Sequence, residues 1–251
     1  MPLRIDGTRV EGDLDLSSAP LVQRTAALAS SSPRTIGKNG LCVFQAECGV
    51  LVSDAMSLTE PRMIGSPDAT NCVIVLVWAK GDTANVAAAC HIDGSRRAGS
   101  LTGALLQPAY EAWKRHNAAA KSDPAWQVSL VGAFDAVADS DTVGAVVASL
   151  SASPHEYDLV HANILQLNCA VASEPACPGH GDGGSGHSCG HNHADGGGDD
   201  DEGQALTYPL VMHAAIDVAD GSVCVADFSY LGPDAVLRAA RVSRARLVGA
   251  L

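Results

Sequence analysis

The chain has 251 residues, a formal net charge of −12, 47% hydrophobic residues and only 4% aromatic residues. This size suits one large domain or two small ones, with a core built mainly from Ala, Val and Leu. An acidic chain without a basic patch argues against nucleic-acid binding. No apolar run approaches the roughly 20 residues that a membrane span requires, which argues against insertion in a membrane.

The N-terminal residues, MPLRIDGTRVEGD, lack the apolar central region of a signal peptide. We therefore expect an intracellular protein, in the cytoplasm with the nucleus as a second location. In that reducing environment the eight cysteines should be mostly thiols rather than a disulfide framework.

Strands dominate the centre of the chain and helices flank them. Strands are expected at residues 2–10, within 40–53, and at 72–78, 85–91, 126–134, 157–172, 208–218 and 222–230. Helices are expected at residues 17–31, 101–117, 140–150 and from 233 onward, with Pro108 kinking or splitting the second. We predict an α+β fold, an α/β sandwich with a largely antiparallel sheet, as a single domain over residues 1–251.

One hairpin carries the candidate chemistry. The run CVIVLVW, from Cys72 to Trp78, is apolar throughout, as a strand buried on both faces should be. Gly81-Asp82 suits a two-residue turn of type II′. Pairing about that turn puts Cys72 opposite His91, with Cβ atoms about 5 Å apart on one side of the sheet. In the same register Cys90 faces Val73 on the other side and is expected to be core.

A thiol beside an imidazole is the minimum equipment for nucleophilic catalysis. The alternative interpretation is structural: Cys72 would be a small buried hydrophobic residue, and His91 would be a hydrogen-bonded histidine at a strand end. The polar loop before the thiol favours catalysis, because backbone N–H groups around Asn71 and Cys72 could hold an oxyanion. Asp93, two residues after His91, could orient the ring or bind a substrate amine. The cysteines in or beside apolar strands are expected to be structural: Cys42, Cys48, Cys169 and Cys224.

A low-complexity segment interrupts the second half of the chain. Residues 177–203 read CPGHGDGGSGHSCGHNHADGGGDDDEG and hold ten of the 25 glycines and four of the nine histidines. Such a sequence cannot bury enough apolar surface to fold, so residues 176–204 are predicted to be a disordered insertion. Its Cys and His suit Zn²⁺, Ni²⁺ or Cu²⁺, but their spacing matches no closed zinc module. We expect no dedicated metal site and no cofactor.

The motifs GSPDATNC and CHIDG resemble the protein N-terminal asparagine amidohydrolase family. Further segments resemble it in the same order: SLVGAF, DLVHANILQLN and YPLVMHAAIDVADGSVCVADF. The resemblance implies a fold similar to other Cys-His deamidases, including bacterial chemoreceptor deamidases and glutamine-deamidating toxins. It implies removal of ammonia from the side chain of an N-terminal Asn, leaving an Asp that enters the N-degron pathway of ubiquitin-dependent degradation.

The resemblance also assigns residues. Cys72 matches the family's nucleophile and His91 its histidine, while Pro2, exposed by removal of Met1, is expected near the site. Ser66, Asp68 and Asp93 are expected to bind substrate, with Asp68 or Asp93 on the α-ammonium. The expected partners are proteins or peptides with N-terminal Asn, bound by a monomer.

Two alternatives stay open. One is an inactive module of the same fold that binds N-terminal residues or metal, and the other is a deamidase of Gln side chains. The family continues beyond the helix that contains LRAAR with further strands and a helix. This sequence ends at Leu251, which leaves open whether it is a shortened form.

Overall fold

The computed structural model describes residues 3–10, 15–37, 40–54, 62–94, 98–134, 140–171, 207–229 and 231. Contacts divide the chain into two compact units. The first is Met1–Cys169 with Pro209–Leu251, and the second is Ala170–Tyr208. The second unit is described only at its ends, where β11 (Cys169–Val171) pairs with β12 (Thr207–Pro209). The predicted insertion at 176–204 lies outside the described residues.

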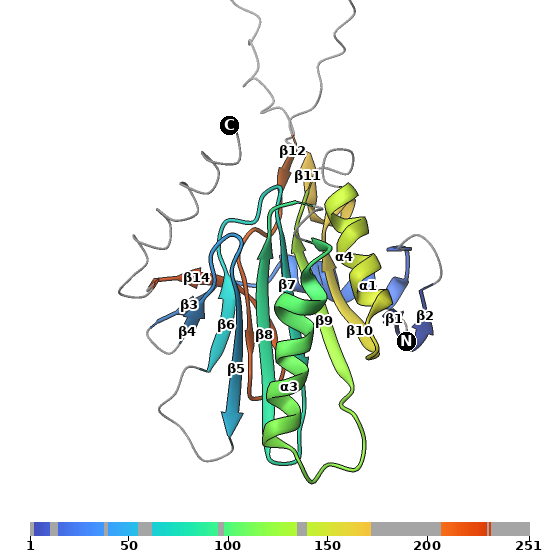
Figure 1. The fold of residues 1–251 in the computed structure, drawn as a ribbon. Coiled ribbons are helices and arrows are strands. Elements are labelled where there is room, and N and C mark those ends of the chain that lie inside the picture. The colour runs from blue at the N-terminus through green and yellow to red at the C-terminus, as the bar shows by residue number, and fades with distance from the viewer. Residues whose placement is uncertain are drawn as a thin grey trace, which may run out of the picture. The chain divides into compact units, whose positions relative to one another are not determined.

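The first unit contains two sheets (Figure 1). The larger has seven strands in the order β2 (Thr8–Arg9), β1 (Leu3–Ile5), β10 (Tyr157–Asn163), β9 (Trp126–Gly132), β7 (Val73–Ala79), β8 (Ala84–Ile92) and β5 (Cys48–Asp54). The smaller has five strands in the order β3 (Arg34–Ile36), β14 (Val223–Phe228), β13 (Ala214–Asp217), β6 (Met63–Ser66) and β4 (Gly40–Cys42). Most pairings are antiparallel; the parallel ones are β1 with β10 and β10 with β9 in the large sheet, and β14 with β3 and β4 with β6 in the small sheet.

The described helices are α1 (Ala19–Ala29), the π-helix η1 (Thr102–Leu106), α3 (Gln107–His116), α4 (Ser140–Ala152) and the 3₁₀ helix η2 (Leu165–Asn168). None of them is long and apolar enough to cross a membrane. Pro108 lies in the first turn of α3, directly after the π-helix. The expected split at this proline is confirmed, because proline cannot supply the N–H that a continuous α-helix requires.

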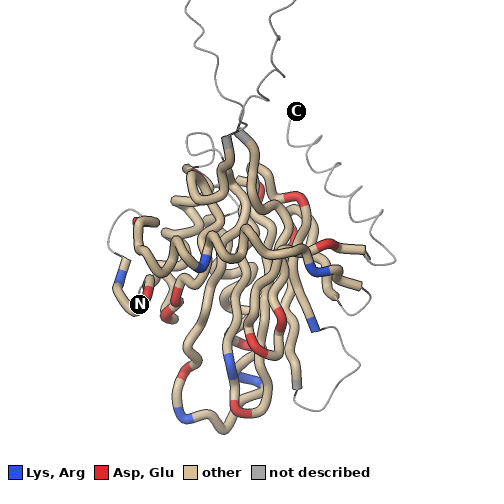
Figure 2. Tube along the Cα trace, turned by 180° about the vertical axis from the view of Figure 1, so that it is seen from behind, with Lys and Arg blue, Asp and Glu red and all other residues tan. Residues whose placement is uncertain are grey.

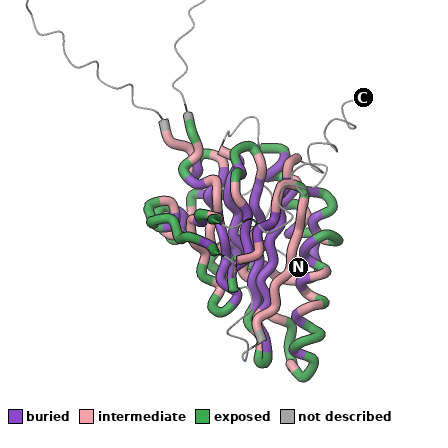
Figure 3. The backbone as a smooth tube through the Cα atoms, turned by 90° about the vertical axis from the view of Figure 1, so that its left-hand side faces the viewer, coloured by how far each residue is buried: buried purple, intermediate pink, exposed green. Residues whose placement is uncertain are grey.

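Alternate side chains of β7 enter two different hydrophobic cores. Val73, Val75 and Val77 pack in a cluster with residues of η1, α3 and α4. Ile74, Leu76 and Trp78 pack in a second cluster with residues of β6 and β13. Every residue of β7 is buried (Figure 3), as the unbroken apolar run predicts. The helices η1, α3 and α4 therefore cover one face of the large sheet and the small sheet packs on the other, and the predicted α+β sandwich is confirmed.

The turn of the β7–β8 hairpin differs from the prediction. Ala79 pairs with Val86, so residues 80–85 connect the last paired positions instead of a two-residue turn. A type II′ turn needs a positive φ at its first central residue, and Gly81 is not among the positive-φ glycines of the described chain. Instead the Asn117 side chain at the end of α3 binds the loop, accepting hydrogen bonds from the backbone N–H groups of Thr83 (2.9 Å) and Ala84 (3.2 Å).

The wider turn shifts the register by two residues. Ile74, not Cys72, lies opposite His91, and Val75, not Val73, lies opposite Cys90. Because side chains alternate with a period of two, an even shift keeps each side chain on its predicted face. The predicted pairing of Cys72 with His91 is therefore wrong in register, although the two residues still share a face.

Three other strand predictions need correction. The long strand at 157–172 is interrupted by η2, and Leu165 has φ 50°, which a continuous strand cannot accommodate. The strand at 208–218 is split into β12 and β13. The segment before the nucleophile loop, expected to be a loop, contains the strand β6, whose four residues are too few for a periodic signal.

Candidate active site

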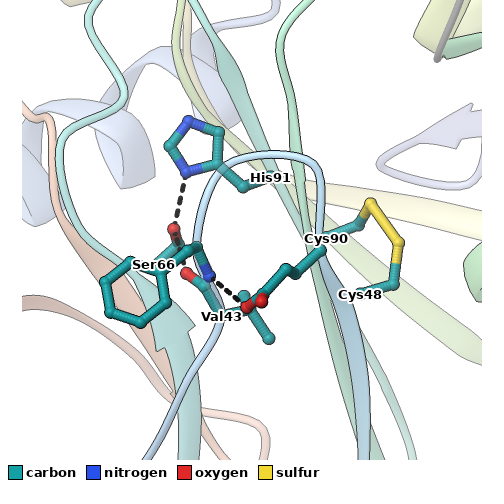
Figure 4. The surroundings of a disulfide bond; sticks show 7 residues. Val43, Cys48, Ser66, Cys90 and His91 are labelled. Atoms are coloured by element: carbon teal, nitrogen blue, oxygen red, sulfur yellow. Dashed lines mark hydrogen bonds between the residues drawn. A yellow bond between two sulfur atoms is a disulfide. The ribbon is translucent and has the colours of Figure 1, made fainter. Parts of the chain in front are cut away.

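His91 and Ser66 form the buried half of the site (Figure 4). Both are almost inaccessible, with 3% and 0% of their surface exposed. The Ser66 Oγ lies 2.7 Å from His91 Nδ1 and donates a 2.6 Å hydrogen bond to the carbonyl of Val43. A carbonyl can only accept, so the single hydroxyl hydrogen is directed to it and the hydroxyl accepts from Nδ1–H. This tautomer leaves Nε2 of His91 as the basic nitrogen.

Cys72 immediately precedes β7, whose first residue, Val73, pairs with Ile92 next to His91. It is half-buried and packs against the cluster between the two sheets, the side on which His91 lies opposite Ile74. The structure therefore brings the predicted thiol and imidazole to one face at neighbouring positions.

Gln45 adds a third polar side chain beside the thiol. Its Nε2 lies 3.6 Å from Cys72 Sγ and 3.1 Å from Asp93 Oδ2. A carboxylate only accepts hydrogen bonds, so the amide end that faces Asp93 must be the NH₂ group. Asp93, half-buried, is thus linked to the thiol through one side chain.

The backbone around Cys72 is held from two directions. The Cys72 carbonyl accepts a 2.9 Å hydrogen bond from Ala133 N–H, and Ala69 N–H donates to the carbonyl of Met212. Gly132 has φ 109°, and a Cβ there would lie 2.2 Å from the Cys72 carbonyl oxygen, so only glycine fits. The fully buried Asn168 joins the two supports by donating to the carbonyls of Gly132 and Val211. The loop before β7, which carries Cys72, is therefore fixed in place.

The neighbouring cysteines lie on the helix-covered face. Cys90 is bonded to Cys48 in a disulfide that joins directly opposed residues of β8 and β5, pointing away from His91 (Figure 4). The expectation that Cys90 is core is confirmed, but both residues were expected to be thiols.

The other described cysteines, Cys42, Cys72, Cys169 and Cys224, are in the thiol form. Burial raises the pKa of the Cys224 thiol.

The structure separates the two aspartates predicted for the substrate amine. Asp68 has 83% of its side chain exposed and lies beside His213, whose Nδ1 accepts a 3.0 Å hydrogen bond from Asp68 N–H. It lines a cavity of about 420 Å³ with Phe44, Pro67 and Phe228, whereas Asp93 lies beside Gln45 and the thiol. Asn71 is exposed in the loop before Cys72. Pro2 lies outside the described residues.

A second histidine–serine pair lies elsewhere in the same sheet. Ser129 Oγ of β9 lies 3.1 Å from His161 Nδ1 of β10. Ser129 is opposite Leu76, which puts this pair on the same sheet face as His91. Burial, reinforced by the charge of Arg24, lowers the pKa of His161 to about 4. His161 is therefore neutral at physiological pH.

Comparison with known proteins agrees with this geometry. A family model described as protein N-terminal asparagine amidohydrolase matches residues 30–183, more than half of the chain. This chain belongs to the protein N-terminal asparagine amidohydrolase family. Similar proteins of that name come from pig (Sus scrofa, 24% identical over 254 residues) and human (Homo sapiens, 23% over 253 residues). Each match covers 96% of this chain and 67% of the relative.

Within this amidohydrolase, two features of the site were not identified from the sequence. Gln45 was missed, and nothing local distinguishes a glutamine that follows an apolar strand. Ser66 is predicted to bind substrate, and its hydrogen bond to His91 is a contact that the sequence did not predict. The six Cys and His of the insertion lie outside the described residues, and among the described ones no group of three His, Cys, Asp or Glu could hold a metal ion.

Proposed function

We propose that this protein hydrolyses the side-chain carboxamide of an N-terminal Asn to Asp, with Cys72 as nucleophile. The observation that carries the proposal is the half-buried thiol on the same sheet face as an imidazole whose tautomer is set by Ser66. This arrangement has the nucleophile, the base and the orienting group of covalent catalysis. Family membership supplies the substrate class.

The reaction has two halves. The Cys72 sulfur attacks the carboxamide carbon while Nε2 of His91 takes the thiol proton, and a C–S bond forms. His91 returns that proton to the departing nitrogen as the C–N bond breaks, releasing ammonia. Water, deprotonated by His91, then adds to the thioester carbon. The C–S bond then breaks, His91 returns the proton to the sulfur, and Asp is released from the regenerated thiol.

Asp93 is the better placed group for the substrate's α-ammonium. Gln45 Nε2 lies within 3.6 Å of the sulfur and 3.1 Å of the Asp93 carboxylate. In Asn the ammonium nitrogen is three bonds from the carboxamide carbon, so an Asn whose carbon meets the sulfur can bring its ammonium to Asp93. Asp68 points to solvent. This anchor would select terminal over internal Asn.

Mass spectrometry of a peptide that begins with Asn tests the reaction. Wild type should give a product about 1 Da heavier, and Cys72→Ala should give none. Cys224→Ala is the matched control, because it removes a thiol from another strand and should leave the product. The proposal would be contradicted if wild type gave no product, or if Cys72→Ala gave as much product as wild type.

The ammonium anchor is tested with the same peptide and its N-acetylated form. Asp93→Asn should raise KM about tenfold or more for the free-amine peptide, because a charge-assisted contact contributes roughly 1.5–3 kcal/mol. Asp68→Asn should change KM little. The acetylated peptide should be a poor substrate for all three proteins. A KM that responds to Asp68→Asn instead would assign the ammonium to the exposed carboxylate.

A further inference from the structure

Gln45 lies where the reaction develops negative charge. Its Nε2 is 3.6 Å from the Cys72 sulfur. When the sulfur bonds to the carboxamide carbon, the oxygen on that carbon lies about 2.7 Å from the sulfur, so a donor at this distance can approach within about 3 Å of it. The Asp93 contact turns the NH₂ end of Gln45 towards this point.

The loop that carries Gln45 is tied to the catalytic histidine. Ala46 N–H donates a 2.9 Å hydrogen bond to the His91 carbonyl, and His91 N–H donates a 3.1 Å hydrogen bond to the Glu47 carbonyl. On its other side, Val43 accepts from Ser66. Backbone on both sides of Gln45 is therefore bound to the His91–Ser66 pair, which fixes the donor before substrate arrives. A donor fixed in advance does not have to reorganise during the reaction, and this makes it effective.

We propose that Gln45 is a catalytic residue whose side-chain N–H donates to the oxyanion of the tetrahedral intermediate. The inference rests on the proposed function and adds a side-chain donor to the backbone groups expected around Asn71 and Cys72. As the C–S bond forms, the carbonyl π electrons move to the oxygen and Gln45 stabilises that charge. When they return, the C–N bond breaks and ammonia leaves with the proton from His91.

Two variants test the donor. Gln45→Met removes the N–H groups at nearly constant length, and Gln45→Glu replaces the donor by an acceptor. Both should lower kcat by about 10²-fold to 10³-fold, the usual effect of removing one oxyanion donor, with KM within about threefold of wild type. Gln23→Met, which makes the same change at an exposed position of α1, should leave both constants unchanged.

Alkylation of Cys72 by iodoacetamide, followed by peptide mapping, separates this role from a structural one. Alkylation forms no oxyanion, so its rate in the uncharged variant Gln45→Met should stay within about threefold of wild type while deamidation falls. A parallel loss of both reactions, or a rise in KM with kcat unchanged, would overturn the inference. An active wild type with fully active Gln45 variants would also overturn it and leave the proposed function standing, whereas an inactive wild type would remove both. If Gln45→Met fails to fold, Gln45→Leu, which is also uncharged and lacks the donor, takes its place in both measurements.

Discussion

Two histidine–serine pairs look alike and differ in what surrounds them: His91 of the large sheet binds Ser66 of the small sheet, and His161 binds Ser129 within the large sheet. Each joins a serine hydroxyl to a histidine Nδ1 on the same sheet face. His91 lies at the end of β8, beside a loop that presents a thiol. His161 lies within β10, next to α1, where Arg24 donates to the carbonyl of Val160. The serine–histidine hydrogen bond by itself therefore does not distinguish the two pairs, and the thiol beside His91 does.

The position of each histidine in its strand decides which side chains lie near it. At a strand end, side chains from several loops converge, and here β6, the β4–β5 connection and the loop before β7 bring Ser66, Gln45 and Cys72 to His91. Within β10, His161 is hydrogen-bonded to Ser129 of the neighbouring strand and lies close enough to Arg24 of α1 for its charge to lower the histidine pKa. Acidic and basic residues are dispersed along the described trace (Figure 2), so local contacts, rather than one broad charged surface, distinguish the two pairs.

The largest expected effect comes from exchanging each histidine for glutamine. His91→Gln should lower kcat by about 10²-fold to 10⁴-fold, since it removes the base that activates the thiol. His161→Gln should leave kcat within about threefold of wild type. Steady-state deamidation of an Asn-starting peptide, with far-UV circular dichroism to check the fold, measures both. Equal losses of kcat in the two variants would show that the two histidines do not differ in their role.

An intermediate effect is expected from the serines. Ser66→Ala should lower kcat roughly fivefold, because it removes a buried hydrogen bond that holds the His91 tautomer, and such a bond contributes on the order of 1 kcal/mol. Ser129→Ala removes the corresponding hydroxyl from the other pair and should leave kcat unchanged. The pH profile of kcat should move only in Ser66→Ala. A profile that moves only in Ser129→Ala would show that the roles are reversed.

The last effect concerns stability at acid pH, with no change of kcat expected, and belongs to His161. Its folded-state pKa of about 4 lies below the ordinary value of 6.5, so between these values the unfolded chain binds more protons. Stability should therefore decline as pH falls below about 6.5, by up to about 3 kcal/mol near pH 4. Urea unfolding from pH 7 to pH 4 should show a shallower decline for His161→Gln. An unchanged slope would mean that another group carries the acid sensitivity.

Much of the scaffold follows from local sequence. The apolar run at β7, the split at Pro108 and the β13–β14 hairpin are visible as periodicity and turn chemistry, and all three are present. The register of the β7–β8 hairpin could not be obtained in this way. It depends on the Asn117 amide, which arrives from the end of α3 and binds the turn. A side chain more than thirty positions away leaves no signal beside Gly81.

The sequence alone determined which face of the strand each residue would occupy. Cys90 and His91 are consecutive in β8, and the period of two sends one to the helix-covered side and the other to the small sheet. Only the tertiary structure decided which groups meet His91 and Cys72. β6 forms by pairing with β13, about 150 residues further along the chain, and the loop of Gln45 is fixed by backbone hydrogen bonds to His91. Such contacts depend on how distant strands pair, and no spacing within a segment encodes them.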